Sequence, residues 1–306
     1  MDVQWMRGCA TALVTPFGAD GAVDVGRLRA LAERQIAGGV RVLVPCGTTG
    51  ESATMTEEED QLVIGTVVEV AHSRGTRVVA GTGSNATADA VRYARGAREL
   101  GADAVLVVAP WYNKPTQGGL YAHFRAVAEA VPETPVMLYN VPGRTSSNIS
   151  AETTLRLAND AENVVAVKEA SGNLSQIMEI LRARPEGFHV LSGDDALTLA
   201  MLALGADGLV SVASNEAPEL MSRMVDAALA VEWEAAREQH YRLLPLMEVN
   251  FIETSPGPAK AALALMGLLE ENLRLPLVPV GEKTRERVRA CLTELGLLEE
   301  TANVAA

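Results

Sequence analysis

Short apolar runs recur along the whole chain, and each is followed by a stretch with helical periodicity. The runs are rich in Val, Leu and Ala, lack polar–apolar alternation, and cover residues 9–14, 42–45, 78–81, 104–109, 135–139, 164–167, 189–191 and 208–212. Such runs are typical of parallel strands covered on both faces. In the stretches between them apolar residues have helical spacing, as in Leu174, Ile177, Met178 and Leu181.

The number of runs predicts the fold class. Eight strands, each followed by a helix, are what a closed (β/α)8 TIM barrel requires. An open doubly wound sheet is the alternative, and periodicity alone does not exclude it. Thr56 followed by Glu59 predicts a capping box at the start of the second helix, and Pro218 suits the first turn of the helix after the last strand.

The pattern changes near residue 230, after which strand-like runs are absent. A helical stripe from Trp233 to Met247 is expected to bend or end near Pro245, and two more helices are expected over 259–269 and 283–296. We therefore predict a barrel over residues 1–230 and a small helical C-terminal domain over residues 231–306, packed on the barrel or on another subunit.

Charge and composition exclude several classes of protein. The 26 basic and 39 acidic residues give a net charge of -13, which disfavours binding to nucleic acid and to an anionic membrane. No apolar run approaches the ~20 residues that span a bilayer, and the first residues do not resemble a secretory signal. Cys9, Cys46 and Cys291 form no CxxC pair, which fits a reducing compartment. We expect a soluble cytoplasmic protein.

Neither the histidines nor a glycine-rich segment predicts a bound metal or cofactor. The four histidines have no partner at metal-ligand spacing, so we predict no metal site. The segment 81–86 matches GxGxxA between a strand and a helix, and could hold a dinucleotide pyrophosphate. That motif belongs to the first βα turn, whereas two βα units precede it here. We interpret it as a tight strand-to-helix turn and predict no cofactor.

Lys168 is the most informative single residue. It ends an otherwise apolar run, where a desolvated ammonium loses its charge more easily. A neutral amine can attack a carbonyl carbon to form a Schiff base. The alternative is a structural lysine paired with Glu169.

Several other reactive side chains follow strands of the predicted barrel. Tyr139 ends the fifth run and Arg144 follows it, while Tyr112 follows the fourth run. In a barrel these residues and Lys168 would share the face where active sites collect. A tyrosine can relay protons, and the planar fork of an arginine matches a carboxylate. The segment Gly47-Thr48-Thr49-Gly50, after the second run, could bind a small anion through its backbone N–H groups, although an ordinary loop is an equal alternative.

With these residues in place, the sequence resembles the dihydrodipicolinate synthase (4-hydroxy-tetrahydrodipicolinate synthase) family of class I pyruvate-dependent lyases. The resemblance extends from Gly8 to Leu298. It is carried by GTTGES at 47–52, AGTGSNAT at 80–87, APWYNKP at 109–115, LYNVPGRT at 138–145, VKEASGN at 167–173 and LSGDD at 191–195. It implies a TIM barrel with a helical C-terminal domain, a homotetramer built as a dimer of dimers, and no metal or organic cofactor.

The resemblance also implies a role for each site residue. Lys168 condenses with pyruvate, and the resulting enamine attacks L-aspartate 4-semialdehyde. Tyr139, Thr49 and Tyr112 match a proton relay, in which Tyr112 reaches the neighbouring subunit's site. The residues that match substrate-binding positions are Thr48 and Thr49 for the pyruvate carboxylate, Arg144 for the semialdehyde carboxylate, and Gly193 and Val210 beside the imine.

Other functions remain as alternatives. A related lyase for a longer sugar acid such as N-acetylneuraminate would share the lysine and tyrosine, but GRT after YNVP is the synthase pattern. A nicotinamide-dependent oxidoreductase would use 81–86 and would have no use for Lys168. An inactive paralogue would not be expected to retain the proton-relay residues, the lysine and the arginine together.

The family resemblance further implies an L-lysine effector site between subunits. The matching positions are Ser52, Ala53, Glu57, Asp60, Asn85, Asp89 and Trp111. Glu57 and Asp60 stand where lysine-sensitive members often have histidines, and Trp111 replaces a tyrosine common in the family. The segment 254–260 also departs from the family pattern, at Ser255 and Gly257. We predict weak or absent inhibition by millimolar lysine, because two extra carboxylates would repel the carboxylate of lysine.

Overall fold

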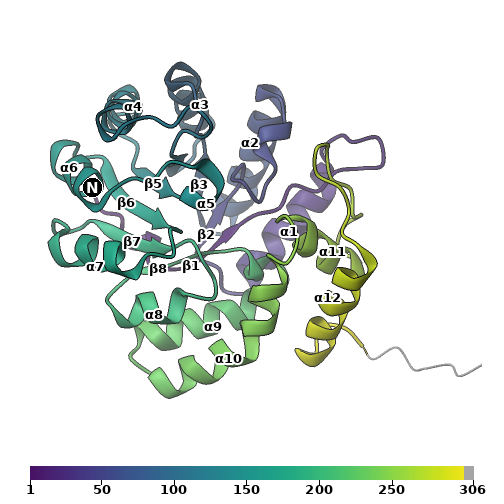
Figure 1. The fold of residues 1–306 in the computed structure, drawn as a ribbon. Helices are drawn as coiled ribbons and strands as arrows, with labels where there is room; N and C mark the ends of the chain where they lie inside the picture. The colour runs from purple at the N-terminus through teal and green to yellow at the C-terminus, as the bar shows by residue number, and fades with distance from the viewer. Residues whose placement is uncertain (300–306) are drawn as a thin grey trace, which may run out of the picture.

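The eight predicted strands form one closed parallel barrel in the computed structural model, which describes residues 1–299 (Figure 1). The strands follow the chain order around the barrel, and the last one pairs with the first. Their bounds are β1 Gly8–Ala12, β2 Val42–Val44, β3 Arg77–Gly81, β4 Ala104–Val108, β5 Val136–Asn140, β6 Val164–Glu169, β7 His189–Ser192 and β8 Gly208–Ser211. The TIM barrel is therefore confirmed, and the open sheet is excluded.

Helices follow the strands and surround the barrel. Those of the barrel are α1 Val25–Ala37, α2 Glu57–Ser73, α3 Thr87–Glu99, α4 Gln117–Ala130, α5 Pro142–Thr145, α6 Ala151–Asp160, α7 Leu174–Ala183, α8 Thr198–Ala203 and α9 Pro218–Leu229. The described residues also form three 3-10 helices, η1 Gln4–Met6 before β1, η2 Ser52–Thr54 and η3 Ala213–Asn215. The capping box of Thr56 and Glu59 is present at the start of α2, and Pro218 lies in the first turn of α9.

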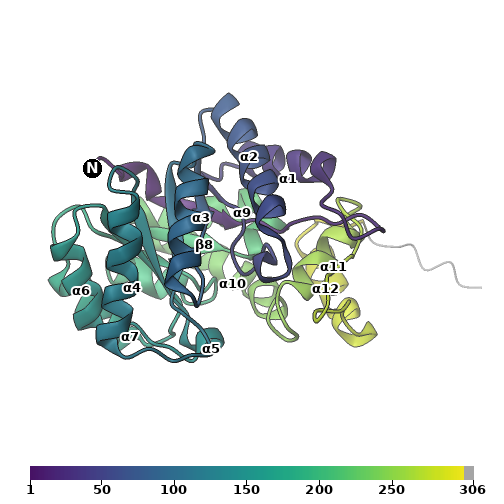
Figure 2. The same cartoon turned by 90° about the horizontal axis from the view of Figure 1, so that it is seen from above.

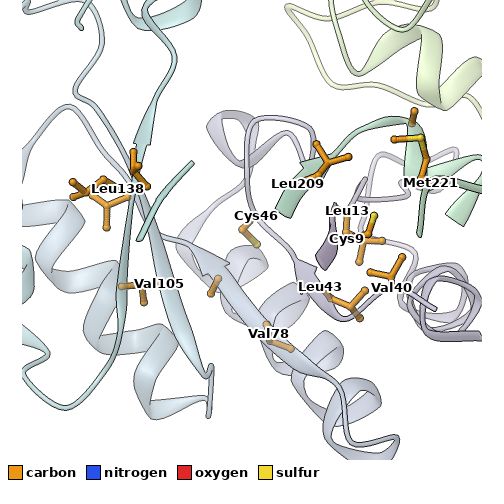
Figure 3. Close-up of a cluster of buried hydrophobic side chains, with 14 of the residues drawn as sticks. Cys9, Leu13, Val40, Leu43, Cys46, Val78, Val105, Leu138, Leu209 and Met221 are labelled. Atoms are coloured by element: carbon orange, nitrogen blue, oxygen red, sulfur yellow. The ribbon is translucent and has the colours of Figure 1, made fainter. Parts of the chain in front are cut away.

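The strands are apolar on both faces because they separate two cores. Leu43, Val78 and Leu138 point outward and pack under the helices (Figure 3). Val42 and Val44, on either side of Leu43, belong to a second cluster inside the barrel. This alternation between two apolar environments explains why the strands read as continuous runs in the sequence.

Up to residue 299, three helices follow the barrel: α10 Trp233–Val249, α11 Gly257–Leu265 and α12 Glu282–Glu294. The first continues through Pro245, so of the two alternatives predicted there, a bend or an end, the end is excluded. The side chains of Leu243, Leu246 and Met247 are buried around this proline, and such packing can compensate for the hydrogen bond it removes. Figure 2 shows α11 and α12 together on one side of the molecule, away from α4 and α6.

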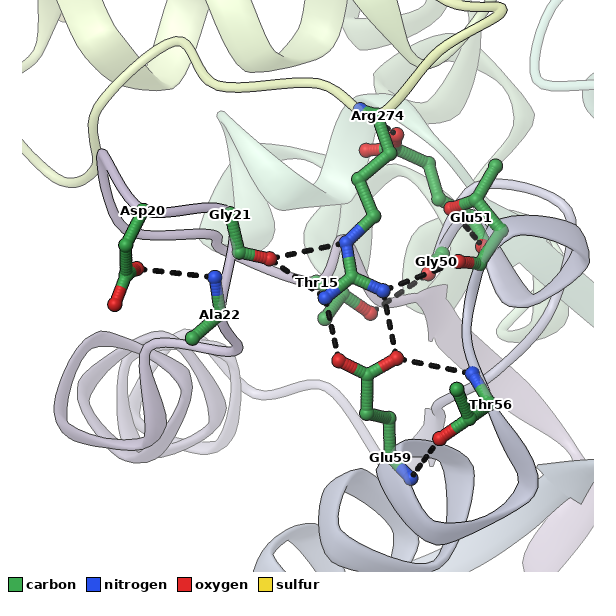
Figure 4. A network of polar contacts seen from close by, with 10 residues as sticks. Thr15, Asp20, Gly21, Ala22, Gly50, Glu51, Thr56, Glu59 and Arg274 are labelled. Carbon is green, nitrogen blue, oxygen red and sulfur yellow. Dashed lines mark hydrogen bonds and ion pairs between the residues drawn. The ribbon is translucent and has the colours of Figure 1, made fainter.

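Arg274, in the loop between α11 and α12, ties this C-terminal part to the barrel (Figure 4). Its guanidinium donates to both carboxylate oxygens of Glu59, at 2.5 and 2.6 Å, and to the backbone carbonyl of Gly21. These hydrogen bonds hold the pKa of the Glu59 carboxyl at about 2. The start of α2 is therefore held both by its own capping box and by Arg274.

Candidate active site

Lys168 and Tyr139 lie side by side on neighbouring strands. They are partners in the register between β5 and β6, near the carboxyl ends of both strands. Both side chains are buried, and the Lys168 Nζ lies 4.2 Å from the centre of the Tyr139 ring. The barrel therefore holds an amine against a phenol at the end where active sites of this fold occur.

Gly193 packs against the stem of the same lysine. A Cβ at this position would come within 2.9 Å of Lys168 Cε and 2.8 Å of Ala170 Cβ. A side chain here would displace the lysine. Val210 is buried in β8, in the apolar cluster inside the barrel that also contains Tyr139.

The chain has four lysines, and their surroundings differ. Lys114 and Lys283 are exposed. Lys260 is fully buried, and burial lowers its pKa, but it pairs with Glu51 and donates to the carbonyl of Asn272 at 2.8 Å. Glu169 does not pair with Lys168, contrary to the alternative considered from sequence; it accepts from Ser171, Asn140 and Gln176.

The Thr48–Thr49 loop follows β2 and has the form of a turn. Gly50 and Glu51 donate their N–H groups back to the carbonyls of Gly47 and Thr48. Within residues 1–299, the N–H groups of Thr48 and Thr49 make no backbone hydrogen bond. Thr49 is buried and Thr48 is exposed. The loop can therefore offer N–H groups to a small anion.

A cavity of about 480 Å³ opens next to these residues. Of the predicted catalytic and substrate-binding residues, it is lined by Thr48, Tyr139 and Arg144. Arg144 lies on α5, directly after β5; its side chain is exposed, and it takes part in none of the ion pairs among residues 1–299. An unpaired guanidinium in a cavity is suited to a ligand carboxylate.

Four other predicted residues do not line this cavity: Lys168, Thr49, Gly193 and Val210. Lys168, Thr49 and Val210 are buried. Tyr112 is also outside the lining set, because its side chain points to solvent and is 86% exposed. Its backbone has φ +72°, a conformation that non-glycine residues rarely adopt.

The predicted effector residues divide into two groups. Ser52, Ala53, Asp60 and Trp111 line the same cavity as Tyr139 and Arg144, so within one chain the two predicted sites are continuous. Glu57, Asn85 and Asp89 lie outside the lining set. Asn85 donates to the carbonyl of Trp111 at 3.4 Å.

The charges of the predicted effector residues differ from the sequence expectation. Arg92 donates to Glu57 at 2.9 Å and to Asp89 at 2.7 Å, so one guanidinium offsets both carboxylates. The Asp60 carboxyl has no such partner, and burial raises its pKa to about 7. Sequence reasoning missed Arg92, which lies three residues after Asp89 on α3 and at helical ion-pair spacing.

The glycines of the GxGxxA segment have a packing explanation. A Cβ on Gly81 would come within 2.1 Å of the Cys46 carbonyl oxygen, and one on Gly83 within 2.6 Å of the Val108 nitrogen. The close approach of these chain segments therefore requires both glycines. Among residues 1–299, His, Cys, Asp and Glu side chains form no group of three or more that could hold a metal, and no helix there is long and apolar enough to cross a membrane.

The model of the Dihydrodipicolinate synthetase family matches residues 5–295. The chain belongs to this family. It is 54% identical to the 4-hydroxy-tetrahydrodipicolinate synthase of Koribacter versatilis (strain Ellin345) over 96% of this chain and 97% of that protein. The sequence-based family assignment is thus confirmed.

Solved structures of the family have the same fold. The crystal structure of dihydrodipicolinate synthase from Aquifex aeolicus superposes with a TM-score of 0.93 at 46% identity, covering 95% of this chain and 99% of that one. The enzyme from Cyanidioschyzon merolae, determined with lysine bound, gives 0.94 at 43% identity, covering 96% and 99%.

Proposed function

We propose that this chain is a 4-hydroxy-tetrahydrodipicolinate synthase, which condenses pyruvate with L-aspartate 4-semialdehyde. The observation that carries the proposal is the buried Lys168 amine, held 4.2 Å from the Tyr139 ring at the carboxyl end of the barrel. Full-length similarity to synthases of this activity supports it. The product is a precursor in lysine and diaminopimelate biosynthesis.

The proposed chemistry begins with Lys168 as nucleophile. Its neutral amine adds to the keto carbon of pyruvate, and water leaves to give a protonated imine. The imine accepts electrons, so a methyl proton leaves and an enamine forms. The enamine carbon attacks the aldehyde of the semialdehyde, and the substrate's own amino group then closes the ring and releases Lys168.

Substrate binding is proposed to divide between the hydrogen-bond donors of the Thr48–Thr49 loop and the guanidinium of Arg144. The N–H groups and hydroxyls of Thr48 and Thr49 would hold the pyruvate carboxylate, and Arg144 would hold the semialdehyde carboxylate. Gly193 and Val210 would border the imine, where the absence of a Cβ at 193 leaves room for the lysine stem. No cofactor is needed, because the imine is itself the electron acceptor.

Proton transfer is proposed to need a second subunit. Tyr139 and Thr49 would relay protons with Tyr112 of the partner subunit. The exposure of Tyr112 in the single chain, on a strained loop, supports a role outside its own barrel. We propose a homotetramer, a dimer of dimers, in which each Tyr112 completes a neighbouring site. Tyr112→Phe should therefore lower the turnover of the oligomer.

Regulation by L-lysine is proposed to be weak. The proposed effector residues are Ser52, Ala53, Glu57, Asp60, Asn85, Asp89 and Trp111. The structure of the Cyanidioschyzon merolae relative contains bound lysine, so lysine itself is the ligand to test. Arg92 offsets Glu57 and Asp89, which leaves Asp60 as the carboxyl without a cation partner in the effector set. A steady-state titration with half-inhibition well below one millimolar lysine would contradict weak inhibition.

We also propose a domain division and a cellular location. Residues 1–230 would form the catalytic barrel and 231–306 the C-terminal domain, of which 300–306 lie outside the described residues. A cytoplasmic location is supported by the free thiols of Cys9, Cys46 and Cys291.

Trapping with borohydride tests the proposed function. Incubation with pyruvate and borohydride should attach a pyruvyl group to the peptide that contains Lys168, and Lys168→Ala should abolish the adduct. The purified enzyme should then consume pyruvate with the semialdehyde and not with an N-acetylated amino sugar. Mass spectrometry that finds the adduct on Lys260 or on no lysine would refute the mechanism.

A further inference from the structure

One layer beyond the Tyr139–Lys168 pair, the same two strands hold a second pair of polar side chains. Asn140 and Glu169 are register partners, and they are 0% and 1% exposed. Because side chains alternate along a strand, this pair faces away from Tyr139 and Lys168, toward the helices. Polar side chains this deeply buried require hydrogen-bond partners.

The Glu169 carboxylate is surrounded by donors. Its oxygens accept from the Ser171 N–H at 2.8 Å, from Asn140 Nδ2 at 3.1 Å and from Gln176 Nε2 at 3.2 Å. All three contacts are N–H groups of fixed segments, so the site requires a side chain that only accepts. An amide at position 169 would point an NH2 group at one of these donors.

Asn140 also forms hydrogen bonds to the segment that follows β5. Its Nδ2 also donates to Asn148 Oδ1 at 2.9 Å, and its Oδ1 accepts from the Ile149 N–H at 2.9 Å. Gln176 adds a bond from its Nε2 to the Ile149 carbonyl at 3.2 Å. The last residues of the segment 141–149 are thus fastened to the two strands that hold Lys168 and Tyr139.

Arg144 lies in the middle of this segment. The segment begins at the end of β5 and ends at the Asn140–Glu169 network, so both of its ends are fixed to the barrel. The short helix α5 between them presents Arg144 to the cavity. The position of its guanidinium therefore depends on a network that does not touch the cavity, since neither Asn140 nor Glu169 lines it.

We propose that Glu169 and Asn140 are positioning residues that set Arg144 for the semialdehyde carboxylate. The inference rests on the proposed function, and it concerns the second substrate only. Lys168 is held in position because its strand, β6, pairs with β5 on one side and with β7 on the other. The segment that carries Arg144 is instead held by hydrogen bonds from the Asn140 side chain. Loss of the network should displace Arg144 and leave formation of the pyruvate imine in place.

Glu169→Gln is the first variant to test, because it keeps the shape of the side chain. It should raise the KM for the semialdehyde about tenfold, the loss expected when a charged hydrogen-bonding group is misplaced. The rate of borohydride trapping with pyruvate should stay within about threefold of wild type. The matched control is Asp207→Asn, which alters another buried carboxylate, one that accepts from the Val190 N–H at 2.9 Å at the opposite end of the barrel. Asp207→Asn should leave the semialdehyde KM unchanged.

Two double variants separate positioning from general damage. Adding Glu169→Gln to Arg144→Ala should raise the semialdehyde KM no further, because the positioned group is already absent. The exchange variant, with Asn140→Asp and Glu169→Gln together, should not recover the affinity, because the amide at 169 still meets the Ser171 and Gln176 donors and a carboxylate at 140 cannot donate to Asn148 Oδ1. Additive effects in the first pair, or equal loss of trapping and semialdehyde binding in Glu169→Gln, would overturn the proposal. A wild-type enzyme that forms no adduct on Lys168 would instead refute the proposed function itself.

Discussion

A methyl group added at Gly193 should slow imine formation without unfolding the protein. In Gly193→Ala the new Cβ would lie 2.9 Å from Lys168 Cε, 3.0 Å from Lys168 Cγ and 2.8 Å from Ala170 Cβ. Contacts this short must be relieved, and the lysine stem is the more mobile neighbour. It would swing aside and carry the amine away from Tyr139. Overpacking of this kind costs about 1–3 kcal/mol. Expressed in the rate of imine formation, that is a loss of roughly 5- to 160-fold.

The assay is the rate of borohydride-trapped adduct at saturating pyruvate, beside a thermal melt of the same protein. If the lysine stem absorbs the strain, the melting temperature should change by only a few degrees, because 1 kcal/mol corresponds to about 2–4 °C in a protein of similar size. Gly118→Ala is the matched control, since its Cβ would meet only Thr116 Oγ1, at 3.9 Å. A Gly193→Ala enzyme that traps pyruvate at the wild-type rate would refute the reasoning.

Three further predictions follow from charges in the structure. Arg144→Ala should raise the semialdehyde KM at least tenfold, because a hydrogen bond to a charged group contributes ~1.5–3 kcal/mol. The rate of borohydride trapping with pyruvate should not change. If trapping and semialdehyde binding are lost to the same extent, Arg144 is structural. Asp60 has a pKa raised to about 7 by burial, so its stabilising contribution is complete below its ordinary pKa near 3.8 and is lost as the pH rises through 7. Asp60→Asn should therefore raise the melting temperature relative to wild type more at about pH 8 than at about pH 4, and an equal change at both values would contradict it. Lys260→Met should cost about 3–5 kcal/mol by leaving Glu51 buried and unpaired, and the double variant with Glu51→Gln should melt higher than Lys260→Met alone.

The barrel could be predicted because each strand carries its own signal. The strands are buried on both faces, so a continuous apolar run marks each of them regardless of its neighbours. The same logic singled out Lys168, since a lysine in such a run has few structural reasons to be there. The end of a helix is less local: α10 continues through Pro245 because buried side chains on both sides of the proline hold it.

The polar networks could not be predicted, because their members lie far apart in the sequence. Arg274 reaches Glu59 and Gly21 from the other end of the chain, and Lys260 finds its partner in Glu51. Glu169 was considered only as a partner for its neighbour Lys168, although strand alternation directs the two to opposite faces. Its true partners lie on β5 and α7. The alternation was readable in the sequence, but the partners were not.

The two buried lysines show why burial alone does not select a nucleophile. Both lie over an aromatic ring, with Lys168 Nζ 4.2 Å from the Tyr139 centre and Lys260 Nζ 4.3 Å from that of Phe17. The Lys260 amine is engaged by the Glu51 carboxylate and the Asn272 carbonyl, so its proton is held by fixed acceptors. Lys168 forms no ion pair with any side chain in the described part of the chain, and its ring neighbour is a phenol that can exchange protons. The amine of Lys260 is thus occupied by fixed partners, whereas the amine of Lys168 lacks an ion pair and faces a phenol. This difference in partners, rather than in exposure, is the reason for proposing Lys168 and not Lys260 as the nucleophile.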